Sequence, residues 1–337
     1  MSSAEAVAHK VAQKAQRLST FSPYGYTPEK SAGIAYIVVF AILGLIHIGM
    51  GIRYKYWLVF ATLIPGTFLE VIGWAGRLWS AYNVYDITPF LMQIASLIIG
   101  PAFYSAWAYT ILGYCITQLG PAYSLLKPNM YLAVFVTADV ISLVIQAIGG
   151  GKAAVAAQEG TDTHSATKVM LAGILFQLGT MTVFVALASD FILRVIFRKP
   201  YNFLKKRHSK SAANAKAKAE SKRENENEND SPSTPEEIAN TTEIQGEVRT
   251  EGGMNRTAEI KKGEKLLAGV AFASAMIFVR GIYRSIELAQ GWSGYLITHE
   301  VYFIYLDGLP MVLCLAAFAV AHPGWLLPRR KGWIRAK

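Results

Sequence analysis

The sequence predicts an all-α polytopic membrane protein: one bundle of seven transmembrane helices, with the N-terminus outside and the C-terminus in the cytoplasm. The chain of 337 residues is 53% hydrophobic, and its apolar residues are gathered into seven long runs. Runs of about 18 or more apolar residues can cross a bilayer as helices. The runs are continuous rather than alternating, which favours helices over a barrel. Basic residues are divided unevenly between the connections, which predicts the orientation.

The predicted spans follow one another with short connections, except between the fifth and the sixth. They are 32–52, 57–79, 90–117, 130–148, 169–197, 266–290 and 301–327. Tryptophans lie near several predicted ends, as interface-anchoring aromatic residues do: Trp57, Trp79, Trp292 and Trp325. The predicted organisation is therefore an extracytoplasmic tail (1–31), helices one to five (32–197), a cytoplasmic loop (198–264), helices six and seven (265–327) and a basic cytoplasmic tail (328–337).

Lysine and arginine are concentrated in the connections after spans one, three and five and in the C-terminal tail, which share one side. The positive-inside rule makes that side cytoplasmic. Of the loops on the opposite side, 80–89 and 290–300 contain neither residue. The N-terminal segment conflicts with this assignment, because it contains Lys10, Lys14, Arg17 and Lys30. The larger cytoplasmic count decides the prediction. The net charge of +10 suits an anionic membrane surface, and no nucleic-acid motif accompanies it.

The segment 198–264 is the only long polar stretch, and its composition predicts disorder. Its basic start, 198–210, is expected to bind anionic lipid, at roughly 1 kcal/mol for each lysine or arginine near the surface. Phosphorylation in the Ser-Pro and Thr-Pro sites at 231–235 would weaken that attraction. An unregulated, solvated linker explains the same composition.

Charged and amide side chains recur inside the spans at similar predicted depths, in the middle or outer part of the bundle. Several are spaced seven residues apart, which places them on one helical face. The predicted ligand-binding residues of this polar cavity are Glu70, Arg77, Gln93, Asp139, Gln146, Gln177, Arg280, Arg284, Glu287, Glu300 and Asp307. An unpaired charge at the bilayer centre costs about 2.5 kcal/mol or more. Convergence on the bundle axis is therefore expected, although a purely structural ion-pair network is the alternative.

Other polar residues in the spans have simpler interpretations. Asp190 and Arg194 are four residues apart and predict a local ion pair, and His47 predicts a hydrogen-bonded core histidine. Prolines at positions 65, 101 and 310 predict kinks in spans two, three and seven, which act either as hinges or as static bends. Cys115 and Cys314 lie inside apolar spans and predict unpaired thiols.

Catalysis is not expected, and neither a cofactor nor a metal is predicted. The segment Gly149-Gly150-Gly151-Lys152 lacks the spacing and the following hydroxyl residue of a phosphate-binding loop. His299 and His322 bracket span seven and are about 34 Å apart at helical rise, so they cannot share a metal or a haem. Without an ATP site, the chain cannot drive transport by its own ATP hydrolysis.

In chain order, the polar motifs resemble those of the fungal lipid-translocating exporter family, also called RTA-like seven-helix proteins. The motifs are Glu70-x-x-Gly73-Trp74-x-x-Arg77, Gly100-Pro101 with Tyr109, Asp139-x-x-Ser142-x-x-x-Gln146 before the three glycines, Arg280-x-x-Tyr283-Arg284-x-x-Glu287, then Gly291, His299-Glu300, Tyr305, Asp307 and His322-Pro323-Gly324. The likeness covers roughly residues 24 to 326 apart from the long loop. Trp74 departs from the usual tyrosine, and Tyr114 stands where a basic residue is common.

The resemblance implies a fungal protein of the plasma membrane, or of an endomembrane, that moves amphipathic molecules or gives resistance to them. Sphingoid bases, sterol analogues and porphyrins are the substrates it implies. A cationic amine would then lie among Glu70, Asp139, Glu287 and Asp307, with Arg280 and Arg284 setting the charge of these acids or holding a phosphate instead. The alternatives are a seven-helix receptor or sensor that signals through its cytoplasmic loop and tail, and a scaffold acting through partner flippases.

Overall fold

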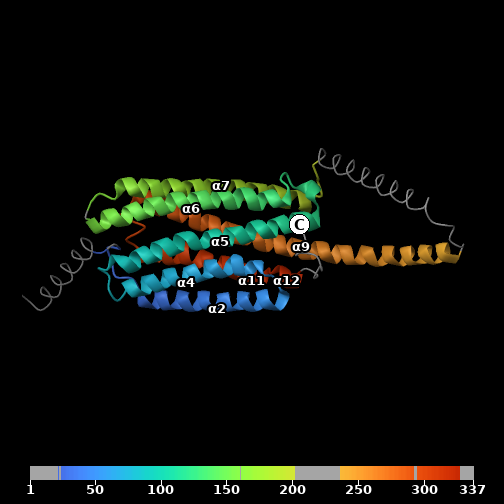
Figure 1. The fold of residues 1–337 in the computed structure, drawn as a ribbon, viewed down its shortest axis with the longest axis horizontal. Helices are drawn as coiled ribbons and strands as arrows, with labels where there is room; N and C mark the ends of the chain where they lie inside the picture. The colour runs from blue at the N-terminus through green and yellow to red at the C-terminus, as the bar shows by residue number, and fades with distance from the viewer. Residues whose placement is uncertain (1–21, 23, 160, 202–235, 292–293, 327–337) are drawn as a thin grey trace, which may run out of the picture.

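The computed structural model describes residues 22, 24–159, 161–201, 236–291 and 294–326. Within these ranges the protein is helical throughout, and seven helices are long and apolar enough to span a membrane. They lie side by side along one axis (Figure 1). Apolar side chains that remain exposed, such as Leu45, Val183 and Val320, lie on these helices and face lipid, as in other integral membrane proteins.

The helix order follows the predicted spans, with ends shifted by a few residues at most positions. α2 spans Lys30–Tyr54, and α3 (Leu58–Ala61) and α4 (Leu63–Ser80) form the second span. α5 (Ile87–Leu119), α6 (Pro128–Glu159) and α7 (His164–Ile196) follow, with a short 3-10 turn, η1, at Pro121–Tyr123. α9 spans Glu236–Gln290, and the last span consists of α10 (Glu300–Phe303), the π-helix η2 (Ile304–Gly308), α11 (Leu309–Val320) and α12 (Pro323–Leu326).

Prolines explain the irregular helices. Pro65 has no backbone N–H to donate to the carbonyl oxygen of Ala61, and the second span breaks into α3 and α4 at Thr62. Pro310 follows the π-helix η2 in the same way, so the wider turn occurs where the regular hydrogen-bond ladder is interrupted. By contrast, Pro101 lies inside the uninterrupted helix α5.

The helix α5 occupies the centre of the bundle and contacts α4, α6, α9 and α11. Glycines allow α4 to approach it closely: a Cβ atom at Gly76 would lie 2.8 Å from the carbonyl oxygen of Pro89, and one at Gly66 would lie 3.0 Å from that of Gly100. Small residues at such interfaces let helix backbones approach in a membrane. The buried apolar cluster includes Leu97, Tyr104 and other residues along α5.

The predicted disordered loop at 198–264 differs from the structure over its C-terminal part. Residues from Glu236 onward belong to α9, which begins well before the predicted span start at position 266 and projects beyond the bundle (Figure 1). A packed helix supplies the nucleus that a polar, Glu- and Lys-containing segment lacks on its own, so the helix can extend into it. Residues 202–235, including 202–210 and the 231–235 motif, lie outside the described ranges.

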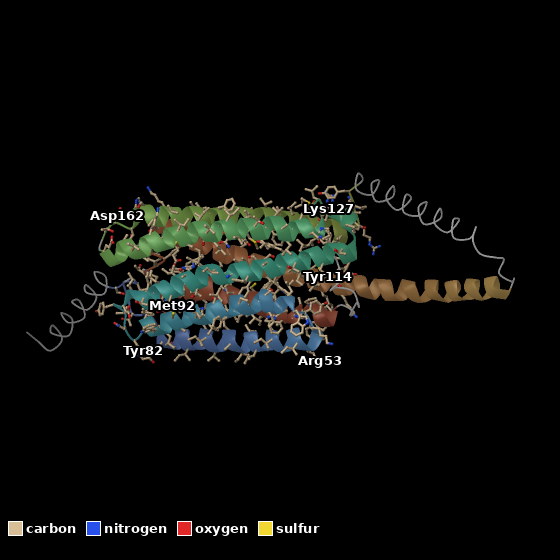
Figure 2. The ribbon with its side chains drawn as sticks, viewed as in Figure 1. Arg53, Tyr82, Met92, Tyr114, Lys127 and Asp162 are labelled. Carbon is tan, nitrogen blue, oxygen red and sulfur yellow. The ribbon has the colours of Figure 1, made fainter. Side chains whose placement is uncertain are left out.

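Basic residues mark one end of the bundle. Arg53 and Lys127 lie at the end from which α9 projects, whereas Tyr82 and Asp162 lie at the other (Figure 2). Successive spans run in opposite directions, so the connections that contain Arg53 and Lys127 are expected at one end and those that contain Tyr82 and Asp162 at the other. Which end faces the cytoplasm stays a prediction from the charge count. The predicted basic tail at 328–337, the N-terminal segment before residue 22 and Trp292 lie outside the described residues.

Candidate functional site

Two neighbouring cavities lie between the helices, and they share the wall residues Ile98, Ile174 and Arg284. Their empty volumes, which include space open at the mouths, are about 620 and 520 Å³. We call the first the terminal lobe; among its lining residues are Tyr24, Tyr26, Arg77, Gln93, Glu287 and Phe303. We call the second the central lobe; among its lining residues are Ser105, Tyr109, Asp139, Gln146, Gln177, Met181, Ile277 and Arg280.

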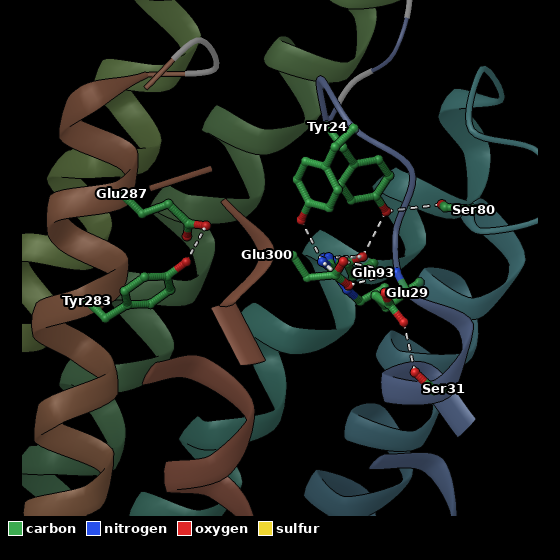
Figure 3. Close-up of polar contacts among 10 residues, drawn as sticks. Tyr24, Glu29, Ser31, Ser80, Gln93, Tyr283, Glu287 and Glu300 are labelled. Carbon is green, nitrogen blue, oxygen red and sulfur yellow. Dashed lines mark hydrogen bonds and ion pairs between the residues drawn. The ribbon is translucent and has the colours of Figure 1, made fainter. Parts of the chain in front are cut away.

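Arg77 organises the terminal lobe. Its guanidinium group is buried, forms a 2.9 Å ion pair with Glu300 and donates a 2.6 Å hydrogen bond to the hydroxyl of Tyr26. Its Nη1 lies 3.4 Å from the amide oxygen of Gln93. Glu300, in the first turn of α10, also accepts the backbone N–H of Glu29 at 3.0 Å. The N-terminal segment, α4, α5 and α10 therefore meet at one charged cluster (Figure 3).

Tyr24 closes this cluster from the side of the N-terminal segment. Its hydroxyl lies 2.8 Å from the amide oxygen of Gln93 and 3.0 Å from the hydroxyl of Ser80 (Figure 3). Burial raises the pKa of Tyr24 to about 12, although the nearby positive charge of Arg77 acts in the opposite direction. The phenol therefore stays protonated at neutral pH and remains a hydrogen-bond donor.

A second charged cluster joins α9 to the π-helix η2. Asp307 is fully buried and lies 3.0 Å from Arg280 Nε and 2.6 Å from Arg284 Nε. Arg284 also donates a 2.8 Å hydrogen bond to Glu287, which accepts the hydroxyl of Tyr283 at 3.0 Å (Figure 3 shows the Tyr283–Glu287 pair). The spacing of three or four residues places these α9 side chains on one face.

Pro101 explains why a backbone oxygen of α5 is free to accept a hydrogen bond from Arg280. Proline has no backbone N–H, so the carbonyl oxygen of Leu97, four residues earlier, lacks its helical partner. The Nη2 of Arg280 donates to that oxygen. Pro101 thus frees an acceptor on α5 for a buried cation on α9, within a helix that continues without interruption.

The central lobe contains a different set of polar groups. Asp139 is 4% exposed and accepts the hydroxyl of Tyr109 at 3.0 Å. Two turns further along α6, Gln146 donates a 3.0 Å hydrogen bond to Gln177 on α7. A Cβ atom at Gly173 would lie 2.7 Å from the Cγ of Gln146, so this glycine makes room for the amide pair.

Glu70 lies apart from both lobes, although it was predicted to line the cavity. Its side chain is 1% exposed, and among the described residues neither carboxyl oxygen has a hydrogen-bond partner. It faces the close contact between α4 and α5, where a Cβ atom at Gly100 would lie 3.2 Å from Oε1. Helix packing covers this residue, so a ligand in the lobes does not reach it.

The structure brings eight of the eleven predicted residues to the cavity walls: Arg77, Gln93, Asp139, Gln146, Gln177, Arg280, Arg284 and Glu287. Glu300 and Asp307 lie behind the walls, paired with wall arginines. The sequence prediction missed Tyr24 and Tyr26, which precede the first span and carry no periodic pattern. It also left Ser105 unassigned, because a lone serine in an apolar helix is common.

Several simpler predictions are confirmed. Asp190 and Arg194 form a 2.9 Å ion pair, and His47 is buried with its Nε2 3.0 Å from the carbonyl oxygen of Leu315. Both cysteines are free and buried. Trp74, one of the two departures from the family pattern, stacks on Tyr36 with ring centroids 4.0 Å apart and does not line either lobe.

Comparison with known proteins gives a consistent set of relatives. A family model described as RTA1 like protein matches residues 63–330. The sphingoid long-chain base transporter RSB1 of Saccharomyces cerevisiae (strain Lalvin EC1118 / Prise de mousse) is 33% identical over 309 residues, which cover 91% of this chain and 74% of the relative. Protein RTA1 and Protein RTM1 of Saccharomyces cerevisiae are each 25% identical, over 90% of this chain and 85% and 92% of their own lengths. No solved structure matches.

Proposed function

The chain belongs to the RTA1-like protein family, and from that premise we propose that it is a membrane transporter of amphipathic, lipid-like molecules, with sphingoid bases and sterol analogues as substrate classes. The observation that carries this proposal is the pair of neighbouring lobes, whose walls bear charged and amide groups inside an otherwise apolar bundle. Ionisable groups within membrane spans are costly and mark substrate pathways. The plasma membrane is the location we propose, with 198–210 resting on anionic lipid.

An amphiphile suits both parts of these walls. Its headgroup would find hydrogen-bonding partners at the polar groups, and its alkyl chain would contact the apolar wall residues Ile98, Ile174 and Ile277. Such a site lowers the cost of moving a polar headgroup through hydrocarbon, because fixed dipoles and charges replace its water. This role requires neither a cofactor nor a covalent step, and we propose no enzymatic activity.

The course of α9 favours a second candidate, a membrane sensor. This helix carries Arg280 and Arg284 at the cavity and continues without a break to Glu236, beyond the bundle. A ligand that moved these arginines would shift a rigid rod at the end of the molecule where Arg53 and Lys127 lie (Figure 2). The sensor and the transporter differ in whether the purified protein alone moves its ligand.

Reconstitution tests the transport proposal. Purified protein in liposomes is expected to move a fluorescent long-chain amine between leaflets faster than protein-free liposomes do. Ile174→Trp fills the junction of the two lobes and is expected to remove most of that flux. Leu175→Trp is the matched control, because Leu175 is 50% exposed on the lipid side and should retain it. Flux equal to that of protein-free liposomes, or equal in both variants, contradicts the proposal.

A further inference from the structure

We propose that the central lobe is the headgroup site for a primary ammonium with hydroxyls on neighbouring carbons, with Asp139 binding the ammonium and Gln146 and Gln177 binding the hydroxyls. This assignment rests on the transport function proposed above and narrows it to one lobe and one carboxylate. It starts from the balance of charges around the two lobes, which the ion pairs define.

The three arginines at the cavity already have anionic partners. Arg77 is paired with Glu300, and Arg280 and Arg284 share Asp307, with Glu287 as a further partner of Arg284. Three guanidinium groups thus face three carboxylates. None of these acids is available to a cationic ligand unless an arginine first loses its partner, which is strongly unfavourable for a buried charge.

Asp139 is the carboxylate at the cavity that is not paired with any of these three arginines. Among the described residues it has no ion pair, and its side-chain partner is the neutral hydroxyl of Tyr109. A buried carboxylate without a counter-charge is costly. A ligand ammonium would supply that charge together with three N–H donors, of which the second oxygen of Asp139 can accept at least one. Arg280 lines the same lobe, but it is ion-paired with Asp307, and its Nη2 donates to the carbonyl oxygen of Leu97.

The other acids predicted to hold an amine are ruled out by position or by pairing. Glu70 likewise has no hydrogen-bond partner among the residues that the structure describes, but it is sealed between α4 and α5 and lines neither lobe. Glu287 and Asp307 are committed to arginine. Of the acids predicted to hold an amine, Asp139 is therefore the one that both lines a lobe and has no ion pair among the described residues.

The amide pair gives this lobe a second specificity element. The side-chain NH₂ group of Gln146 donates to the side-chain carbonyl of Gln177. The carbonyl of Gln146 and the NH₂ group of Gln177 are then left for hydrogen bonds with a ligand. A hydroxyl can both donate and accept, so it matches such a pair. Asp139 and Gln146 are seven residues apart on one face of α6, about 10 Å along the axis. A headgroup between these two positions would lie beside Ser105 of the facing helix α5, which lines the same lobe.

The apolar part of the lobe offers a place for the alkyl chain. Leu178 and Met181 on α7 and Ile277 on α9 line it, and Gly281 lies where α7 and α9 meet. A Cβ atom at Gly281 would touch only the end of the Leu178 side chain, at 3.1 Å. One flexible side chain, that of Leu178, therefore narrows the gap between these helices. A change of its rotamer would let the alkyl chain of a ligand pass between α7 and α9 toward the lipid.

Four C18 probes test the assignment, with binding to protein in nanodiscs and flux in liposomes as readouts. They are 2-aminooctadecane-1,3-diol, its N-acetyl derivative, octadecylamine and octadecanoate. Wild-type protein is expected to bind the amino-diol best. Asp139→Asn should lower the affinity for the amino-diol on the order of tenfold, to the affinity that the wild-type protein has for the uncharged N-acetyl derivative. Asp139→Glu should restore part of this loss. Gln146→Leu should lower the affinity for the amino-diol to that for octadecylamine, and it should leave the affinity for octadecylamine unchanged.

The controls separate the two proposals. Asp190→Asn removes a carboxylate of similar size whose ion pair lies outside both lobes, and it should bind all probes as wild type does. Folding of each variant is followed by its melting temperature. If amphiphiles are moved but Asp139→Asn binds the amino-diol as wild type does, the headgroup site is wrong and transport stands. If no probe is moved by wild-type protein, the proposed function itself fails.

Discussion

At the scale of single residues, the partner of a buried charge decides what its removal costs. Asp307 contacts two arginines, and its neutralisation would leave two buried guanidinium groups facing one remaining acid, Glu287. Glu70 is equally buried, but no cation contacts it among the described residues. Two acids that look alike in the sequence therefore have opposite energetic roles.

We expect Asp307→Asn to destabilise the folded protein by about 3–5 kcal/mol, because it strands paired cations. Glu70→Gln should change the stability by less than about 1 kcal/mol, since the amide has the same shape and no cation loses its partner. Thermal and denaturant unfolding in the same detergent measure both. Equal losses for the two variants would show that Glu70 has a cationic partner in the folded protein.

At the scale of helices, the glycine cluster on α6 sets the packing against α7. A Cβ atom at Gly149 would lie 2.5 Å from the backbone nitrogen of Met170 and 2.8 Å from its Cα, so the two backbones could not keep their distance. At Gly151, only two residues away, a Cβ atom would meet nothing within 4 Å. The glycine run 149–151, which superficially resembles a phosphate-binding loop, thus forms a helix–helix contact in which Gly149 is the residue that the close approach requires.

Gly149→Ala is expected to lower the melting temperature and to reduce flux, since α7 must move away and carry Gln177 from Gln146. Gly151→Ala should be neutral or slightly stabilising, because alanine favours the helix over glycine by about 1 kcal/mol. Melting temperatures of the two variants, compared with wild type, check this. A stable Gly149→Ala protein would mean that α6 and α7 lie further apart than described.

At the scale of the whole molecule, the long connection between the fifth and sixth spans is separable from the bundle. The backbone N–H of Tyr201 bonds the carbonyl oxygen of Ala122, and a Cβ atom at Gly263 would lie 3.0 Å from Leu119. Both ends of the connection therefore rest on the same short stretch, formed by the end of α5 and by η1. Closing the chain there would not strain the helices that build the lobes.

Deletion of residues 205–260 distinguishes the two candidate functions. A transporter is expected to keep its flux in liposomes, because every wall residue of the lobes lies outside the deleted segment. A sensor would keep ligand binding and lose its downstream response in cells. Loss of flux together with unchanged ligand binding and melting temperature would show that the projecting part of α9 takes part in transport.

The predicted orientation is tested separately with glycosylation reporters fused to each terminus. We expect the N-terminal reporter to be modified and the C-terminal one to remain unmodified, because the basic connections share the side of the C-terminus. The membrane potential and the anionic cytoplasmic leaflet both act on that distribution of charge. A modified C-terminal reporter reverses the orientation while leaving the bundle and its lobes unchanged.

The seven spans can be predicted from the sequence, because length and apolar composition are properties of each segment alone. Helical periodicity is also local, so it predicts that Arg280, Arg284 and Glu287 share a face. Which acid meets which base depends instead on how α6, α9 and η2 pack, because that packing sets the distances of Asp307 and Asp139 to the arginines. The same packing joins Leu97 to Arg280 through Pro101 and separates Glu70 from the lobes, because contacts between helices are not encoded in any one of them.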